Sequence, residues 1–271
     1  MYINTRSKEQ IEESICKVLN ISIKELDDLL VDCYNKFQKD HQVFIMDNQY
    51  DYFYEFIKEH QCKIIDKVLF IHLGRRLKDD HDDNGYNFVD LLSKETSLSK
   101  YMKDYDVYFE YDKYIKMFVD HKEMMLEEQS NIYSYLYLRD RFGYRYKDFG
   151  FKGYIFADEM KNSDIYHIHE QGPEFFGHLF LFMNNDKMSD EFYEKSDYYQ
   201  LEYLVPIDMI CFDDFYELNN QDKQRHMIVR CLQRLYEYKY DFDMIKSENR
   251  IVGIADNMNL SDCFLVNKIK I

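Results

Sequence analysis

The chain has 271 residues, of which 46% are hydrophobic and 32% are charged, enough for one large domain or two small ones with a real core. Its formal net charge of −16 disfavours direct binding to nucleic acid and anionic membranes, and it fits either simple solubility or a basic protein partner. The six cysteines form no C-x-x-C pair, and no stretch resembles a secretory signal or a membrane span, so we expect a reduced, cytoplasmic protein without a metal site.

Residues 1–61 are predicted to form a helical N-terminal extension. The motifs SKEQ, starting at Ser7, and SIKE, starting at Ser22, are capping boxes, and apolar residues follow each at helical spacing. A third helix with an aromatic face is expected over residues 50–57. This part contains no catalytic constellation, so we interpret it as a cap or a partner-binding arm. Residues 62–271 form the remaining domain of the prediction.

The stretch KIIDKVLFIHLGRR, residues 63–76, is the centre of the second predicted domain. Its continuous apolar run indicates a buried strand, which ends at His72. Gly74, Arg75 and Arg76 follow directly. A histidine at the end of a buried strand, with glycine and arginines behind it, suits the binding of a polar ligand.

The remaining chain alternates predicted strands and helices. Residues 79–85, DDHDDNG, indicate a solvated acidic turn, because they lack the alternating oxygen ligands and closing glutamate of a calcium loop. The expected helices span residues 87–94, 97–103, 130–142, 158–169, 173–182 and 219–239. The expected strands span residues 106–110, 114–119, 149–156, 198–205, 209–212, 250–255 and 263–269. The pattern predicts an α+β domain fused directly to the helical extension.

Three stretches together resemble the ADP-ribosyltransferase superfamily of the diphtheria-toxin and poly-ADP-ribose-polymerase type. His72–Arg75, followed by NFVDLL from Asn87, is similar to a strand ending in His-Gly-Ser/Thr-Arg and its Asn-Phe-x-x-Ile-Leu helix. GYIFAD, residues 153–158, is similar to the family's Gly-Ile-Tyr-Phe-Ala-Asp strand, and LEYLV, residues 201–205, to its Asn-Glu-Tyr-Ile-Val strand. The resemblance is patchy within residues 63–215.

The sequence departs from the family pattern at two points. Leu73 separates His72 from Gly74, and the family's stacking tyrosine aligns with Ile155, one position after Tyr154. Because a shift of one residue in a strand moves a side chain to the other face, two alternatives stay open. Either the register slips so that Tyr154 stacks, or the position is occupied by isoleucine and the triad is degenerate.

The resemblance implies a split mixed or antiparallel sheet of ADP-ribosyltransferase type, with NAD as the substrate. It implies that His72, Gly74, Arg75, Arg76 and Tyr154 bind NAD and that Glu202 and Tyr154 are catalytic. His72 would bind the ribose on the adenosine side, an arginine the pyrophosphate, and Tyr154 the nicotinamide face. Glu202 would stabilise the positive charge that develops on the other ribose. Its position inside an apolar strand independently indicates a polar cleft or a solvated edge.

The expected function is therefore transfer of ADP-ribose to a macromolecular acceptor, most simply a protein. A bacterial or bacteriophage toxin, defence or counter-defence factor would fit the composition. The alternative is a non-enzymatic acidic interaction module or inhibitor, which includes a catalytically dead transferase fold.

Overall fold

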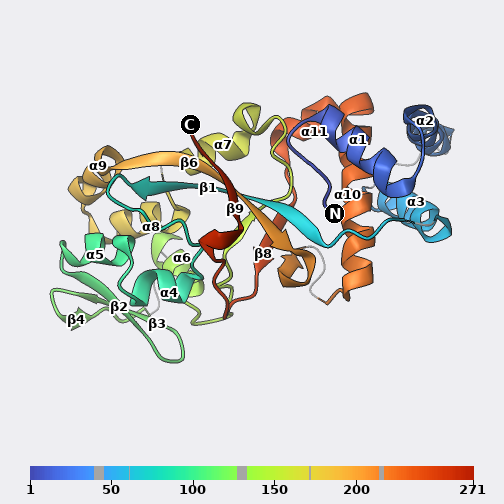
Figure 1. Ribbon diagram of the computed structural model, residues 1–271. Coiled ribbons are helices and arrows are strands. Elements are labelled where there is room, and N and C mark those ends of the chain that lie inside the picture. The colour runs from blue at the N-terminus through green and yellow to red at the C-terminus, as the bar shows by residue number, and fades with distance from the viewer. Residues whose placement is uncertain (40–45, 61, 127–132, 171, 214–216) are drawn as a thin grey trace. The chain divides into compact units, whose positions relative to one another are not determined.

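The computed structural model describes residues 1–39, 46–60, 62–126, 133–170, 172–213 and 217–271. The described chain is a mixture of helices and strands, with one six-stranded and one three-stranded sheet (Figure 1). This confirms the predicted α+β class.

The chain groups into two compact units whose boundary falls within several strands. Unit 1 comprises Met1–Ile71, Gly153–Tyr166 and Leu204–Val252. Unit 2 comprises His72–Lys152, His167–Tyr203 and Gly253–Ile271. These limits differ from the proposed division at residues 61 and 62, which stays a prediction.

Among the described residues, five α-helices lie wholly within unit 1. They are α1 (Lys8–Leu19), α2 (Ile23–Lys39), α3 (Met46–Glu59), α10 (Asn220–Tyr240) and α11 (Phe242–Ser247). The caps read from the sequence are present: Gln10 N donates to Ser7 Oγ, and Ser22 and Glu25 cap each other. The long α10, drawn in orange in Figure 1, packs against α1 and α3.

The six-stranded sheet brings the three key stretches together. Its strands are β1 (Lys67–Leu77), β5 (Lys152–Tyr154), β6 (Ser196–Pro206), β7 (Ile210–Phe212), β8 (Ile251–Ile254) and β9 (Leu265–Lys270). They lie in the order β7-β8-β5-β1-β6-β9, so β1 has β5 on one side and β6 on the other. β5 runs antiparallel to β1, with Tyr154 opposite Ile71, and β9 runs antiparallel to β6.

The expected strand over residues 149–156 is shorter than predicted, because β5 has only three residues. Side chains and a distant loop take the backbone donors on both sides of it. The N–H groups of Phe149 and Gly150 donate to Asp256 Oδ1, and that of Phe156 donates to Asn249 Oδ1. The N–H group of Ala157 donates to the carbonyl of Thr5. Backbone groups satisfied in this way cannot extend a strand ladder.

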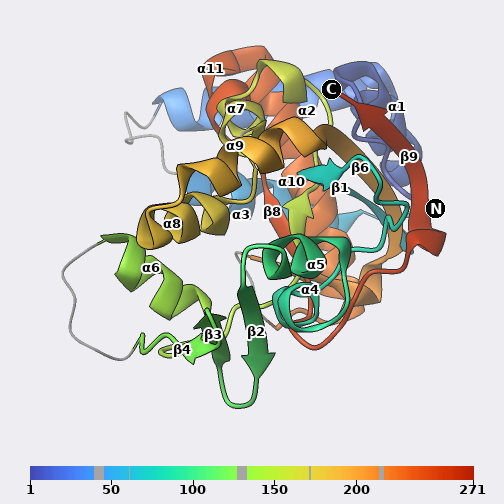
Figure 2. The ribbon, with the colours of Figure 1, turned by 90° about the vertical axis from the view of Figure 1, so that its left-hand side faces the viewer.

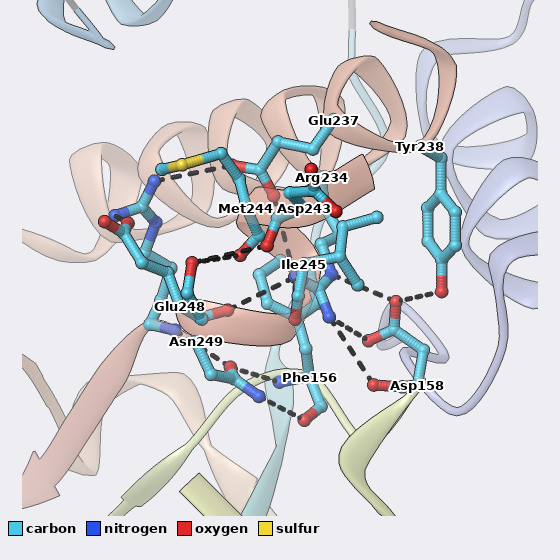
Figure 3. Close-up of polar contacts among 12 residues, drawn as sticks. Phe156, Asp158, Arg234, Glu237, Tyr238, Asp243, Met244, Ile245, Glu248 and Asn249 are labelled. Carbon is cyan, nitrogen blue, oxygen red and sulfur yellow. Dashed lines mark hydrogen bonds and ion pairs between the residues drawn. The ribbon is translucent and has the colours of Figure 1, made fainter. Parts of the chain in front are cut away.

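The expected helix over residues 158–169 is also different. A 3₁₀ turn (Met160–Asn162) precedes the shorter α7 (Asp164–Glu170), whose first turn is capped by Ser163 Oγ accepting from Tyr166 N. Asp158, the expected N-cap, instead lies in a buried polar cluster of unit 1 (Figure 3). Its carboxylate accepts hydrogen bonds from Arg234 at 3.0 Å and from the Tyr238 hydroxyl at 2.7 Å.

Unit 2 contains a second sheet and its own aromatic core. The hairpin β2 (Val107–Tyr111) and β3 (Ile115–Val119), extended by β4 (Lys122–Glu123), lies beside α4 (Phe88–Ser93) and α5 (Ser97–Lys103) in Figure 2. The helix α6 (Tyr133–Arg141) packs along α8 (Glu174–Met183), which is followed by α9 (Asp186–Lys195). Phenylalanine rings from these elements fill the core between them. The predicted helix start at residues 130–132 lies outside the described residues.

Candidate functional site

His72 is held in one orientation by the strand next to it. Its Nδ1 lies 2.9 Å from the carbonyl oxygen of Lys152. Burial, reinforced by the charge of Arg76, lowers the pKa of His72 to about 3. The imidazole is therefore neutral at pH 7. Because a carbonyl accepts only, the proton is on Nδ1 and Nε2 carries the lone pair. His72 thus offers an acceptor suited to a hydroxyl group.

Gly74 makes room for this imidazole. A Cβ atom at position 74 would lie 2.8 Å from His72 Nε2, closer than side-chain atoms approach each other. The two residues are two apart in β1, so they share one face of the strand. The glycine expected to border the ligand therefore also fixes where the histidine ring can lie.

The two arginines after Gly74 differ in their surroundings. Arg75 is buried and its guanidinium donates to Ser196 Oγ, Glu170 O, Tyr193 O and Ser196 O at 2.7 to 3.0 Å. These contacts give Arg75 a structural role. Arg76 is half-buried, and its charge lowers the pKa of the neighbouring His72. Of the two residues, Arg76 is the better placed to meet an anionic ligand.

Glu202 lies in the centre of β6 with only 1% of its surface exposed. Gln200 Nε2 donates to its Oε1 at 2.8 Å, and Asn267 Nδ2, directly opposite on β9, donates to its Oε2 at 3.4 Å. Gln200 lies two residues earlier on the same face, as the alternation of the strand predicts. A buried carboxylate is thus held at both oxygens by neutral amides.

An aromatic pair connects His72 with β6. The ring of Phe151 lies 4.4 Å from that of His72 and 6.2 Å from that of Tyr203, measured between centroids. The pairing of β6 with β9 is irregular between Glu202 and Tyr203, where the register shifts. The structure therefore groups His72, Phe151 and Tyr203, and it holds Glu202 by the amides of Gln200 and Asn267.

The two candidates for the stacking position lie in unit 1. Tyr154 is the half-buried last residue of β5, and burial raises its pKa to about 12. Ile155 follows the strand and is fully buried. Exposure alone makes Tyr154 the more accessible of the two side chains. Its stacking role stays a prediction.

Two features of the site were not predicted. Phe151 was not predicted to belong to the site, because nothing in the sequence distinguishes it from the other phenylalanines among the 21 in the chain. Its contacts with His72 and Tyr203 are visible only in the folded structure. Asn267 had no assigned role either, because its contact with Glu202 depends on the register of β6 and β9. The contact between Gln200 and Glu202 was predictable from the sequence, because residues two positions apart in a strand lie on the same face.

Metal ligation receives no support from the part of the chain that the structure describes. There, no group of three or more histidine, cysteine, aspartate or glutamate side chains is arranged to hold an ion. Burial lowers the pKa of His169, which lies near His72, whereas His167 contacts Glu170 at 3.7 Å. The grouped side chains offer a hydroxyl acceptor, a guanidinium and an aromatic ring. This combination can bind a sugar, a phosphate and a base.

Comparisons with known proteins give no relative for this chain. No family model matches the sequence, and no curated protein or solved structure matches significantly. None of the helices in the described residues is both long and apolar enough to span a bilayer.

Proposed function

We propose that the protein binds NAD at the His72 side of unit 2 and transfers ADP-ribose to a macromolecular acceptor. The observation that carries the proposal is the strand order β5-β1-β6. Three stretches far apart in the sequence were selected for their resemblance to the transferase strands, and they are neighbours in the sheet. An accidental resemblance would not require this adjacency.

The side chains around His72 match the parts of NAD. The neutral imidazole accepts a hydrogen bond from a ribose hydroxyl through Nε2. Arg76 binds a pyrophosphate oxygen, a role that guanidinium geometry favours. The ring of Phe151 provides an aromatic surface beside His72. Arg75, which the resemblance also offers as a ligand, has its donors occupied by carbonyl and hydroxyl oxygens.

Transfer requires a carboxylate near the ribose. The bond between nicotinamide and the ribose C1′ breaks, and its electron pair leaves with nicotinamide. The oxocarbenium-like ribose is then attacked by a nucleophile of the acceptor, which loses a proton to solvent. Glu202 is the candidate to stabilise that positive charge. Its two carboxylate oxygens accept hydrogen bonds from the amides of Gln200 and Asn267.

A test compares nicotinamide release by the wild type, Glu202→Gln and Glu194→Gln. Glu194 is exposed on α9, so its variant has the same change in charge at a remote position. We expect Glu202→Gln to lose about 100-fold or more in turnover while NAD still binds, since removal of one preorganised electrostatic group costs that much. Equal turnover in all three proteins would exclude Glu202 as the catalytic carboxylate.

A second candidate function is NAD binding without transfer, as in a transferase fold reused for interaction. It is favoured by the position of Glu202, which is almost fully buried and hydrogen-bonded to the amides of Gln200 and Asn267. This candidate predicts that the wild type binds NAD and releases no nicotinamide. A non-enzymatic acidic interaction module without NAD binding would show neither property.

A further inference from the structure

The acidic loop, residues 79–85, is held in unit 2 by hydrogen bonds and an ion pair. Tyr203 donates its hydroxyl hydrogen to Asp83 O at 2.5 Å, and Lys268 forms an ion pair with Asp83 Oδ1 at 2.6 Å. Gly85 and Leu260 exchange two backbone hydrogen bonds of 2.8 Å. The acidic turn expected from the sequence to be merely solvated is therefore anchored to β6, β9 and the segment before β9.

At Gly85 the backbone of this loop lies against the ring of Phe151, which lies beside His72. A Cβ atom at position 85 would lie 2.3 Å from Phe151 Cε1. Phe151 in turn lies against His72 and Tyr203. The loop thus contacts both Phe151, whose ring lies beside His72, and Tyr203, whose ring lies near that of Phe151.

Asp82 places a negative charge near Arg76. Burial opposes the ionisation of Asp82, but hydrogen bonds from Tyr86 and Asn84, helped by the charge of Arg76, outweigh it and lower its pKa. Asp82 is therefore ionised at pH 7. A pyrophosphate bound to Arg76 would be repelled by the negative charge of Asp82 unless Asp82 moved away.

We propose that the acidic loop is an autoinhibitory lid, which must move away from Phe151 and Arg76 before a dinucleotide can bind beside His72. This inference rests on the proposed function for the identity of the ligand. The closed lid supplies, through Asp82, the negative charge that the ligand's phosphates supply when they bind. The affinity for NAD is reduced by the fraction of molecules in which the lid is closed.

The experiment uses the full chain and measures two properties in the wild type and three variants. The first property is the rate at which diethylpyrocarbonate modifies His72, followed by mass spectrometry without NAD. The second is the dissociation constant of NAD, measured by calorimetry. Tyr203→Phe removes the hydroxyl bound to Asp83 O, and Asp82→Asn removes the charge near Arg76. Asp79→Asn, in an exposed position of the same loop, is the charge-matched control.

Both lid variants are expected to increase the modification rate of His72, and to tighten NAD binding, by about two- to tenfold, the range for loss of one hydrogen bond. Asp79→Asn is expected to match the wild type. Unchanged His72 reactivity in Tyr203→Phe and Asp82→Asn would overturn the lid whether or not NAD binds. Faster modification with unchanged or weaker NAD binding would overturn the autoinhibition.

Failure of the proposed function has a different signature. In that case His72 becomes more reactive in both lid variants, yet NAD binds to none of the four proteins at millimolar concentration. Circular dichroism establishes that each variant is folded. If Tyr203→Phe does not fold, the comparison of Asp82→Asn with Asp79→Asn still tests the lid.

Discussion

Adjacent arginines at the end of the same strand have different surroundings in this structure. Arg75 is buried with four neutral acceptors around its guanidinium, whereas Arg76 is half-buried and lies near His72 and Asp82. The sequence offers both residues equally as pyrophosphate ligands. Only the acceptors contributed by residues 170, 193 and 196 distinguish them.

The pair Arg75→Lys and Arg76→Lys tests this difference at the residue scale. Lysine cannot reach all four acceptors of Arg75, so we expect its variant to lose about 2 to 3 kcal/mol of unfolding free energy in urea denaturation. We expect Arg76→Lys to keep its stability and to bind NAD about tenfold more weakly, because the bidentate contact is lost. The opposite assignment, with Arg75→Lys stable and defective in NAD binding, would contradict this account.

At the scale of elements, a buried ion pair attaches α10 to the segment after β5. The side chains of Asp158 and Arg234 are 1% and 2% exposed, and Tyr238 completes the carboxylate's contacts (Figure 3). Arg234 also donates to the carbonyls of Ile245 and Glu248, so the pair connects α10, α11 and the segment after β5. Removing one partner of such a pair leaves a buried charge without compensation.

Asp158→Asn is therefore expected to lower the free energy of unfolding by about 3 kcal/mol, measured by urea denaturation. The matched control is Lys239→Gln, which removes the exposed ion pair with Asp27 and should cost about 0.5 kcal/mol or less. A cost below about 1 kcal/mol for Asp158→Asn would show that the pair contributes little to the stability of unit 1.

The sequence predicted most elements but not where the central ones end. Local signals such as the caps at Ser7 and Ser22 predicted the helix starts, because capping depends on residues two or three positions apart. The short β5 and the missing helix cap at Asp158 depend on Asp256, Asn249 and Arg234, far away in the chain. The same limit applies to the site, where Glu202 could be selected but its partner Asn267 could not.

At the scale of the whole molecule, buried neutral histidines make stability depend on pH. Burial, with a neighbouring arginine, lowers the pKa of both His72 and His226 to about 3. Since the unfolded values are near 6.5, the unfolded chain binds more protons below that pH, and stability falls as the pH falls from about 6.5 toward 3.

We expect each of these two histidines to cost about 2 kcal/mol of unfolding free energy between pH 7 and pH 5. Urea denaturation at the two pH values measures this loss of unfolding free energy. In His226→Gln the loss should be smaller by about 2 kcal/mol, which is the contribution of one histidine. This window lies above the ordinary titration of most carboxyl groups, so they contribute less. Equal stability at pH 7 and pH 5 would contradict the buried, neutral state of both imidazoles.

The central claim, that NAD binds beside His72, is tested most directly by calorimetric titration of NAD into the wild type and His72→Asn. The asparagine amide can still donate to Lys152 O, as Nδ1 does now, but it lacks the Nε2 acceptor. We predict that the wild type binds NAD and that His72→Asn binds it at least about tenfold more weakly, the loss for a buried hydrogen bond of about 1.4 kcal/mol. Absence of binding to the wild type at millimolar NAD, or equal affinity in both proteins, would contradict the account.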